Sequence, residues 1–193
     1  MLDNLKKYNI VLASKSPRRC ELLRGMGIDF EVMTKDIAEV VPPSIATDDV
    51  AEYLSMLKSN AFTQHELPPH FLLIAADTVV INDNHILGKP HTHAEACAML
   101  ASLSGKQHSV VTGVTVRSAS VCRSFAARSE VTFEKLTSEM INHYVDHYRP
   151  YDKAGSYGIQ EWIGYVAISS IEGSFYNVMG LPTQKLFKTL CNF

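Results

Sequence analysis

The sequence predicts an α/β fold in which helices flank a mixed, twisted sheet. Short apolar runs typical of buried strands alternate along the chain with segments that begin at helix-capping residues and end at glycine or proline. The chain has 193 residues, of which 46% are hydrophobic and 20% charged, and this is the composition of a globular protein with a sizeable core. We find no internal repeat, low-complexity tract or linker, so we expect one domain over residues 1–193.

In the first half of the chain, apolar runs and capped segments follow one another. Ser16 and Pro17 suit the start of a helix, and glycines at 25 and 27 suit its end. The polar triplet 82–84 lies between two short apolar runs and predicts a hairpin turn. We expect strands at 8–13, 28–33, 71–76 and 79–81, a returning strand at 85–88, and helices at 17–25 and 47–64.

The second half repeats this alternation with longer strands. Thr137 opens a segment of helical pattern that Pro150 ends, and two stretches rich in Val, Thr and Ser are typical of strands. A run with two glycines and mixed polar groups, 152–160, indicates a binding loop. We expect helices at 93–103, 138–148 and 183–192, and strands at 108–116, 122–133 and 165–171.

Charge and cysteine usage narrow the class of protein. The net charge of −2 and the isoelectric point of about 6.4 argue against a nucleic-acid polymer as partner, because duplex-binding proteins carry a basic surplus. The four cysteines are far apart and form no C-x-x-C pair, which favours reduced thiols over disulfides or a zinc site. No signal peptide and no apolar run of roughly 20 residues is present, so we expect a cytoplasmic protein without a membrane partner.

A strand-to-helix turn from Ser14 to Arg19 is the first candidate site. A helix start exposes backbone N–H groups and favours anions, and guanidinium groups fork onto phosphate oxygens. With Ser14, Ser16, Arg18 and Arg19 together, the turn predicts a phosphate site. The alternative is an ordinary capped helix with solvated arginines.

Two acidic residues form the second candidate site. Asp77 follows six apolar residues, where a carboxylate must be solvated, paired or bound to a metal because an isolated buried charge is costly. Together with Glu39, from the polar loop before residue 49, it is suited to Mg²⁺, which takes carboxylate and phosphate oxygens. The alternative is that Asp77 only caps a turn, which is common for aspartate.

Two lysines are weaker candidates for phosphate contacts. Lys89 lies between a glycine and a proline, so its backbone is stiff and its ammonium group is presented predictably. Lys58 lies near the edge of the apolar stripe of its predicted helix. Solvated lysines are the alternative for both. The residues alone thus support binding of a phosphorylated small molecule with a divalent metal, and they do not choose between a hydrolase, a transferase and a regulatory binder.

Several short motifs, taken together and in order, resemble the Maf family of nucleoside triphosphate pyrophosphatases. The resemblance runs from about residue 9 to the end of the chain. The motifs are Ser14-x-Ser16-Pro17-Arg18-Arg19 with Glu21-Leu22-Leu23, Ala76-Asp77-Thr78-Val79-Val80, Gly88-Lys89-Pro90, Leu103-Ser104-Gly105, Thr112-Gly113-Val114, Asp152-Lys153-Ala154-Gly155-x-Tyr157-Gly158-Ile159-Gln160 and Val178-Met179-Gly180-Leu181-Pro182.

The resemblance implies a fold related to the inosine triphosphate pyrophosphatases, with two lobes around a central cleft. It also implies hydrolysis between the α- and β-phosphates of a nucleotide, with Mg²⁺ or Mn²⁺ as cofactor. Asp77 then matches the proton acceptor and, with Glu39, a metal position. Arg19, Lys58 and Lys89 match triphosphate-binding positions, and the serines at 14 and 16 line the phosphate turn.

Specificity follows by the same resemblance. Arg18, Thr78 and Gln160 are similar to the set of the subgroup that prefers dTTP and UTP, whereas the 7-methyl-GTP subgroup differs at these positions. The segment Glu161-Trp162 departs from relatives that have glycine after the glutamine, which bears on the shape of the base-side loop. The resemblance further implies a homodimer. The alternative functions are a nucleotide-binding regulator of cell division or septum formation, a 7-methyl-GTP pyrophosphatase, and an inosine or xanthosine triphosphate pyrophosphatase.

Overall fold

The computed structural model describes residues 2–193, and the chain divides into two compact units. Unit 1 consists of the chain up to Asp77 together with residues 112–127 and 180–193, and unit 2 consists of residues 78–111 and 128–179. The two units agree with the expected two lobes, whereas the cleft and the single domain over the whole chain stay predictions. No helix among residues 2–193 is both long and apolar enough to cross a membrane.

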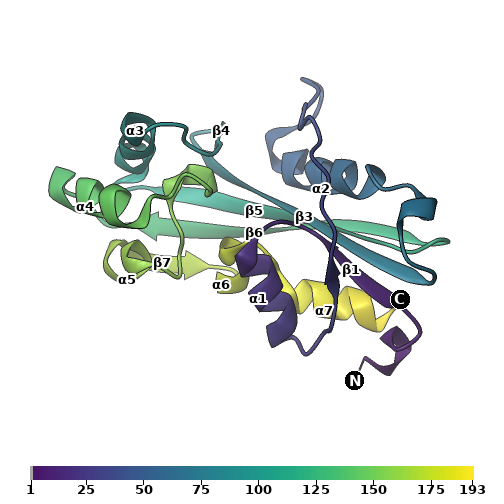
Figure 1. Ribbon diagram of the computed structural model, residues 1–193. Coiled ribbons are helices and arrows are strands. Elements are labelled where there is room, and N and C mark those ends of the chain that lie inside the picture. Colours follow the sequence, from purple (N-terminus) through teal and green to yellow (C-terminus); the bar gives the residue numbers. More distant parts are fainter. Residues whose placement is uncertain (1) are drawn as a thin grey trace. The chain divides into compact units, whose positions relative to one another are not determined.

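Unit 1 contains the amino-terminal strand and the helices that follow it. Within it, α2 lies on one side of β1, and α1 and α7 lie on the other (Figure 1). Its strands are β1 (Asn9–Ala13), β2 (Glu31–Val32), the first part of β3 (Phe71–Asn82) and parts of β5 (Gln107–Arg117) and β6 (Cys122–Phe133). Its helices are α1 (Pro17–Gly25), α2 (Val50–Asn60), α7 (Thr183–Cys191) and short 3₁₀ turns at Asp3–Leu5, Thr47–Asp49 and Gln64–Glu66.

Unit 2 contains the hairpin after β3 and the helices of the central part of the chain. Helices α3 and α4 pack against each other, and α3 also contacts the 3₁₀ turn Ala154–Ser156. Its elements are β4 (His85–Leu87), α3 (His93–Leu103), α4 (Ser138–Tyr148), α5 (Trp162–Ala167), β7 (Ile168–Glu172), α6 (Phe175–Met179), and parts of β5 (Gln107–Arg117) and β6 (Cys122–Phe133), which both continue into unit 1.

The strands form a mixed sheet, as the sequence predicts. The strand order is β2-β1-β3-β5-β6-β7, and β4 pairs with β3 outside this path. Strand β1 runs parallel to β2 and to β3, with Val11 opposite Leu73, whereas β3–β4 and β6–β7 are antiparallel. Because β1 and β3 are parallel, the residues after β1 and those late in the paired part of β3 come to the same edge of the sheet.

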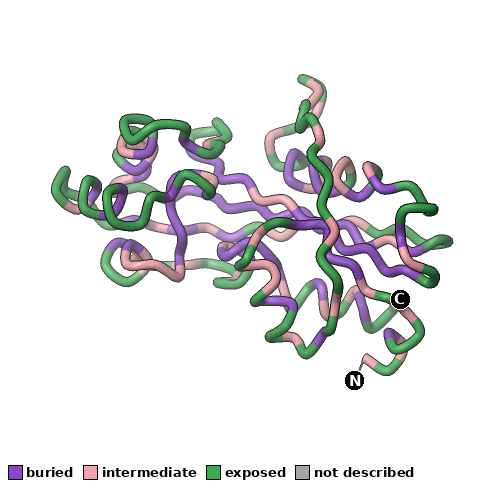
Figure 2. Tube along the Cα trace, in the orientation of Figure 1, coloured by how far each residue is buried: buried purple, intermediate pink, exposed green. Residues whose placement is uncertain are grey.

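The core of unit 1 forms where these parallel strands are covered. Alternate residues of β1 and β3 pack with Phe62 and Leu67, which follow α2. The first half of β3 is buried throughout, and β1 is buried over its last three residues (Figure 2). Burial on both faces accounts for the uninterrupted apolar run before Asp77.

Several elements lie where local sequence signals predict them. Helices α1, α3 and α4 have the expected bounds, and the side chains of Ser16, Thr92 and Thr137 accept backbone N–H groups at their starts. The turn between β3 and β4 places Asp83 and Asn84 at positive φ, +49° and +62°, which is the geometry of a two-residue hairpin turn.

Other expectations were wrong. Residues 28–33 form a strand only at Glu31–Val32. The predicted helix 47–64 begins as a 3₁₀ turn, continues as α2 and ends at Asn60, and a second 3₁₀ turn follows at Gln64–Glu66. The predicted strand 165–171 begins only at Ile168, because residues 162–167 form α5. An apolar run of this length does not distinguish a short helix from a strand by periodicity.

The most consequential correction concerns Asp77. It does not follow the end of a strand but lies inside β3, which runs without interruption from Phe71 to Asn82. Asp77 and Thr78 are the two half-buried positions in this otherwise buried strand. The β-branched residues after them, Val79 to Ile81, continue the strand past the polar pair.

Candidate active site

The turn between β1 and α1 is built by the residues that the sequence indicated. The Ser14 hydroxyl accepts the backbone N–H of Ser16 at 3.2 Å and a guanidinium N–H of Arg19 at 3.3 Å. The Ser16 side chain accepts the backbone N–H of Arg19 at 3.5 Å, which caps α1. Arg19 Nε also donates to the carbonyl of Gly180 at 2.8 Å, so its guanidinium is held from two sides. Arg18 lies in the same first turn.

Lys58 is positioned by the packing of α2 on β5. A Cβ atom at Gly113 would overlap the backbone of Ala51 and Glu52, so the strand and the start of the helix approach as closely as only glycine allows. Two residues further along β5, the Thr115 hydroxyl hydrogen-bonds to Ser55 at 2.7 Å. Two residues beyond that, Arg117 donates to the carbonyl oxygen of Ser59 at 2.9 Å. Alternate residues of one strand thus anchor α2 along its length.

The ammonium group of Lys58 lies between the two predicted carboxylates. It forms an ion pair with Asp77 Oδ1 and lies 3.0 Å from Glu39 Oε1. The Asp77 side chain is 13% exposed and that of Glu39 is 48% exposed, so the cluster extends from the strand to the protein surface. Three residues that are far apart in the sequence therefore meet at one point.

Arg19 belongs to the same electrostatic environment. Burial lowers the pKa of its guanidinium, while the negative charges of Asp77 and Glu39 raise that pKa and the positive charge of Arg18 lowers it further. The net direction is downward, yet arginine stays protonated because its ordinary pKa is far above neutrality. Unit 1 thus brings together two cations, two carboxylates and a hydroxyl-lined helix start, and such a set is suited to phosphate groups.

The two carboxylates also fit the predicted divalent metal. No group of three or more metal-ligating side chains occurs within residues 2–193, so a complete protein cage is absent from the described chain. Magnesium is commonly held by one or two carboxylates together with substrate phosphates, and Glu39 and Asp77 converge on a common point, the Lys58 ammonium. The donor set therefore suits a site that a phosphate ligand completes.

The remaining predicted residues lie in unit 2. Thr78 is half-buried in β3, and Lys89 is exposed in the turn before α3. Gln160 lies at the end of the loop 150–161, and its Oε1 is buried without a hydrogen-bond partner among the described residues. That loop is tied to the Lys89 turn, because the N–H of Gly155 donates to the carbonyl of Gly88 at 3.0 Å.

Sequence reasoning missed the contacts that hold these residues in place. Lys15, which the turn motif leaves unassigned, forms an ion pair with Asp36 at 2.6 Å and so ties the turn to the loop of Glu39. Lys153 and Glu161 form a second ion pair at 3.0 Å beside Gln160. The sequence showed only that these loops contain residues of opposite charge. It did not show which of these residues form ion pairs.

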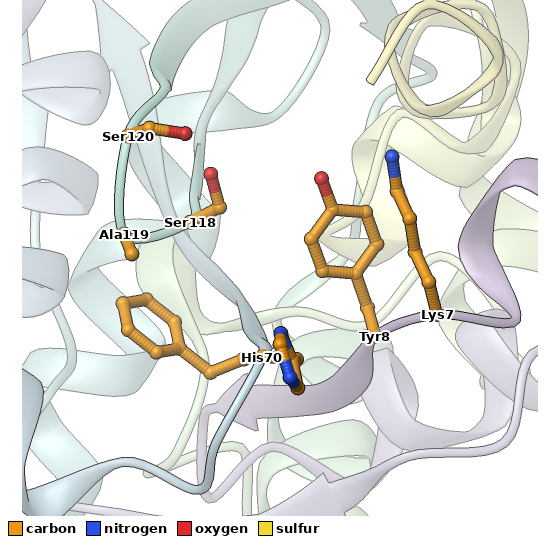
Figure 3. A pocket seen from close by; sticks show the side chains of 7 residues that line it. Lys7, Tyr8, His70, Ser118, Ala119 and Ser120 are labelled. Carbon is orange, nitrogen blue, oxygen red and sulfur yellow. The ribbon is translucent and has the colours of Figure 1, made fainter.

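A separate pocket of about 450 Å³ lies elsewhere in unit 1. It is bounded by the segments before β1 and before β3 and by the turn between β5 and β6 (Figure 3). The residues that line it are Lys7, Tyr8, His70, Phe71, Ser118, Ala119 and Ser120. None of them is a predicted site residue, and the length of β1 separates Tyr8 from the turn at Ser14. The pocket is therefore distinct from the phosphate-site candidate.

Comparisons with known proteins agree with the sequence motifs. The family model described as "Maf-like protein" matches residues 9–193. A protein of Porphyromonas gingivalis named dTTP/UTP pyrophosphatase is 54% identical over 195 residues, which cover 100% of this chain and 98% of the relative. Proteins with the same name from Bacteroides thetaiotaomicron and Flavobacterium johnsoniae are 51% and 42% identical and cover 98% and 97% of the chain and 98% and 96% of the relatives.

The fold has a more distant likeness among solved structures. A HAM1 protein from Coxiella burnetii superposes with a TM-score of 0.53 at 15% sequence identity, covering 96% of this chain and 100% of that one. At this identity the likeness concerns the fold alone. It agrees with the predicted mixed sheet flanked by helices.

Proposed function

The chain belongs to the Maf family, and on this premise we propose that it is a nucleoside triphosphate pyrophosphatase that hydrolyses dTTP and UTP to the monophosphate and pyrophosphate. Full-length relatives that carry this activity in their names, at 42% to 54% identity, support the proposal. The structural observation that carries it is the Lys58 ammonium between Asp77 and Glu39, two carboxylates whose charges also act on the Arg19 guanidinium.

Asp77 is the proposed proton acceptor in this reaction. Hydrolysis requires a base that takes a proton from the attacking water, and a carboxylate held on a rigid strand keeps a constant position for that transfer. The ion pair with Lys58 holds the Asp77 carboxylate in place until the substrate arrives. A phosphate that draws Lys58 toward itself then frees the carboxylate to act as base.

Arg19 and Lys58 bind the triphosphate and stabilise the charge that develops on pyrophosphate as it leaves. Pre-positioned cations are the main source of catalysis in phosphoryl transfer. Ser14 and Gly180 hold the Arg19 guanidinium before substrate binds, so little reorganisation is required. Glu39 and Asp77 would hold Mg²⁺ or Mn²⁺, which supplies charge neutralisation of the phosphates.

The roles of the other residues stay predictions. These are a phosphate contact for Lys89, lining of the phosphate turn for Ser14 and Ser16, and base selection for Arg18, Thr78 and Gln160. The homodimer, the cytoplasmic location and the choice between Mg²⁺ and Mn²⁺ are also untested expectations. A small nucleotide remains the proposed partner, in agreement with the net charge of −2.

A panel of nucleoside triphosphates tests the proposal. The protein is incubated with Mg²⁺ and each of dTTP, UTP, CTP, GTP, 7-methyl-GTP, ITP and XTP, and released pyrophosphate is measured. We expect release from dTTP and UTP above the others. Release from purine nucleotides alone would overturn the pyrimidine assignment. Nucleotide binding without any release would favour the alternative, a nucleotide-responsive regulator of cell division.

A further inference from the structure

An ion cluster centred on a buried lysine lies beside the residue that is proposed to read the base. The side chain of Lys153 is 8% exposed, and its ammonium group lies 3.0 Å from Glu161 Oε1 and 2.7 Å from Asp152 Oδ1. The side chain of Glu161, the residue directly after Gln160, is itself only 19% exposed. A carboxylate that turns inward at this position must have a structural partner, because an unpaired buried charge is costly.

Tyr144 on α4 connects this ion pair to the loop backbone. Its hydroxyl donates to Glu161 Oε2 and accepts the backbone N–H of Gly158 at 3.0 Å. Burial and the hydrogen bond to Glu161 raise the pKa of Tyr144, so the hydroxyl stays protonated and keeps donating. The loop is therefore held by hydrogen bonds on both sides of Gln160, at Gly158 and at Glu161.

Gly158 brings the Gln160 amide and the ion pair into the same space. A Cβ atom at Gly158 would lie 3.0 Å from Glu161 Cδ and from Lys153 Cε, and 3.1 Å from Gln160 Nε2. The side chains of Lys153, Gln160 and Glu161 therefore all lie against this glycine. The Gln160 amide rests beside the cluster with Oε1 buried and unpaired among residues 2–193.

We propose that Glu161, paired with Lys153 and Tyr144, is a positioning residue that orients the Gln160 amide for reading a pyrimidine base. This inference rests on the proposed function. Uracil and thymine offer an N–H donor at N3, whereas cytosine has an acceptor there, so an amide oxygen held in a constant direction distinguishes the two kinds of base. If the cluster is disrupted, the amide turns and can satisfy either base.

The ratio of kcat/KM for UTP to kcat/KM for CTP tests this role. In Glu161→Ala we expect KM for UTP to rise about tenfold, kcat to stay within about twofold, and the ratio to fall about tenfold, the effect of one misplaced hydrogen bond. Tyr144→Phe keeps the buried ring and removes only the hydroxyl, so it should shift the ratio in the same direction by less. Glu161→Gln keeps the size of the side chain and should recover part of the selectivity.

Two controls separate positioning from general stability. Asp83→Asn breaks another ion pair of unit 2, with Lys106 at 2.9 Å on the surface, and should leave the ratio unchanged. In a Gln160→Ala background, Glu161→Ala should cause no further loss of selectivity, because its effect passes through Gln160. The inference is overturned if Glu161→Ala lowers activity on UTP and CTP by the same factor, or if its effect persists without Gln160.

Failure of the proposed function gives a different result. If the wild-type protein releases no pyrophosphate from any nucleotide, the activity is disproved, and calorimetric binding of UMP and CMP to the wild type and to Glu161→Ala decides the positioning role. A wild-type preference for UMP that the variant loses supports the role. Equal preference in both proteins, or no binding of either nucleotide to the wild type, overturns it.

Discussion

Two lysines of this chain each lie between two carboxylates, yet the two clusters differ in exposure and in the groups around them. In unit 1, Lys58 lies between Glu39 and Asp77, with its side chain 21% exposed and that of Glu39 48% exposed. In unit 2, Lys153 is 8% exposed, and its partner Glu161 also receives the Tyr144 hydroxyl. The carboxylates of the first cluster interact with a second cation, Arg19, whereas in the second cluster a neutral hydroxyl holds Glu161 and only Asp152, at 56%, is exposed.

The difference shows how burial and neighbouring charge decide what an ion pair can do. The carboxylates around Lys58 also interact with Arg19, so the charges balance without a single obligatory partner, and an incoming phosphate can take over the ammonium. Lys153 has little access to an external ligand. Its pairing therefore fixes a loop, whereas the ammonium of Lys58, in the proposed function, passes from the carboxylates to a phosphate.

Replacement of Asp77 should have the largest effect on the first cluster. Asp77→Asn preserves the size of the side chain and removes the proton acceptor, so we expect kcat for UTP to fall by at least about 100-fold. Nucleotide binding, measured by calorimetry, should remain detectable. Glu66→Gln removes another carboxylate of unit 1, which pairs with Lys35 at 2.5 Å, and should keep full turnover. Near-normal turnover of Asp77→Asn would show that another group is the base.

Parallel replacement of the two lysines should separate stability from activity. Lys153→Met leaves Glu161 buried without its ammonium partner, and we expect the free energy of unfolding to fall by about 3 kcal/mol in urea denaturation. Lys58→Met should lower that free energy by about 1 kcal/mol, because its cluster is more exposed and Arg19 remains nearby. Lys58→Met should instead lose most of the pyrophosphatase activity. Equal destabilisation by both variants would contradict the comparison.

Lower pH should destabilise unit 2 through a buried histidine that hydrogen-bonds to the loop 150–161. His108 hydrogen-bonds to the hydroxyl of Tyr157 at 2.7 Å, and burial lowers its pKa to about 4, against the opposing effect of Glu130. Between pH 6.5 and 4 the unfolded chain binds a proton at this histidine that the folded chain does not bind, so stability decreases as the pH falls.

From this group alone we expect the free energy of unfolding to fall by about 2 kcal/mol between pH 6 and pH 4.5. His108→Gln should remove this part of the slope, which urea denaturation at several pH values measures. Parallel curves for the wild type and His108→Gln over that range would disprove the assignment.

The sequence alone determined the features that depend on a few neighbouring residues. Ser16 and Pro17 define the start of α1, and the triplet 82–84 defines the turn between β3 and β4, because capping and turn geometry involve side chains within three positions of each other. The motifs that resemble the Maf family are also local, so the family and the set of polar site residues were available without a structure.

Only the tertiary structure decided which charges meet. Asp77 was expected after a strand and lies within one, because its neighbours in the sheet, and not its own polarity, determine where β3 ends. Lys58 looked like a solvated lysine until the packing of Gly113 against Ala51 placed α2 beside β5 and brought the ammonium to Asp77. A long flexible side chain reaches many partners, and backbone packing over a large sequence separation selects one.

The cluster around Lys153 shows the same difference between what the sequence and what the tertiary structure determine, here within a single loop. The sequence showed an acidic residue at 161 but not the direction of its side chain, and the helix α5 that begins at the next residue was not expected. The helix, the buried Lys153 and the Tyr144 hydroxyl together turn its carboxylate inward. Residue types and family thus came from local sequence, whereas the pairing of buried charges came from tertiary packing, because the energy of an ion pair depends on distance and solvent access that no short motif encodes.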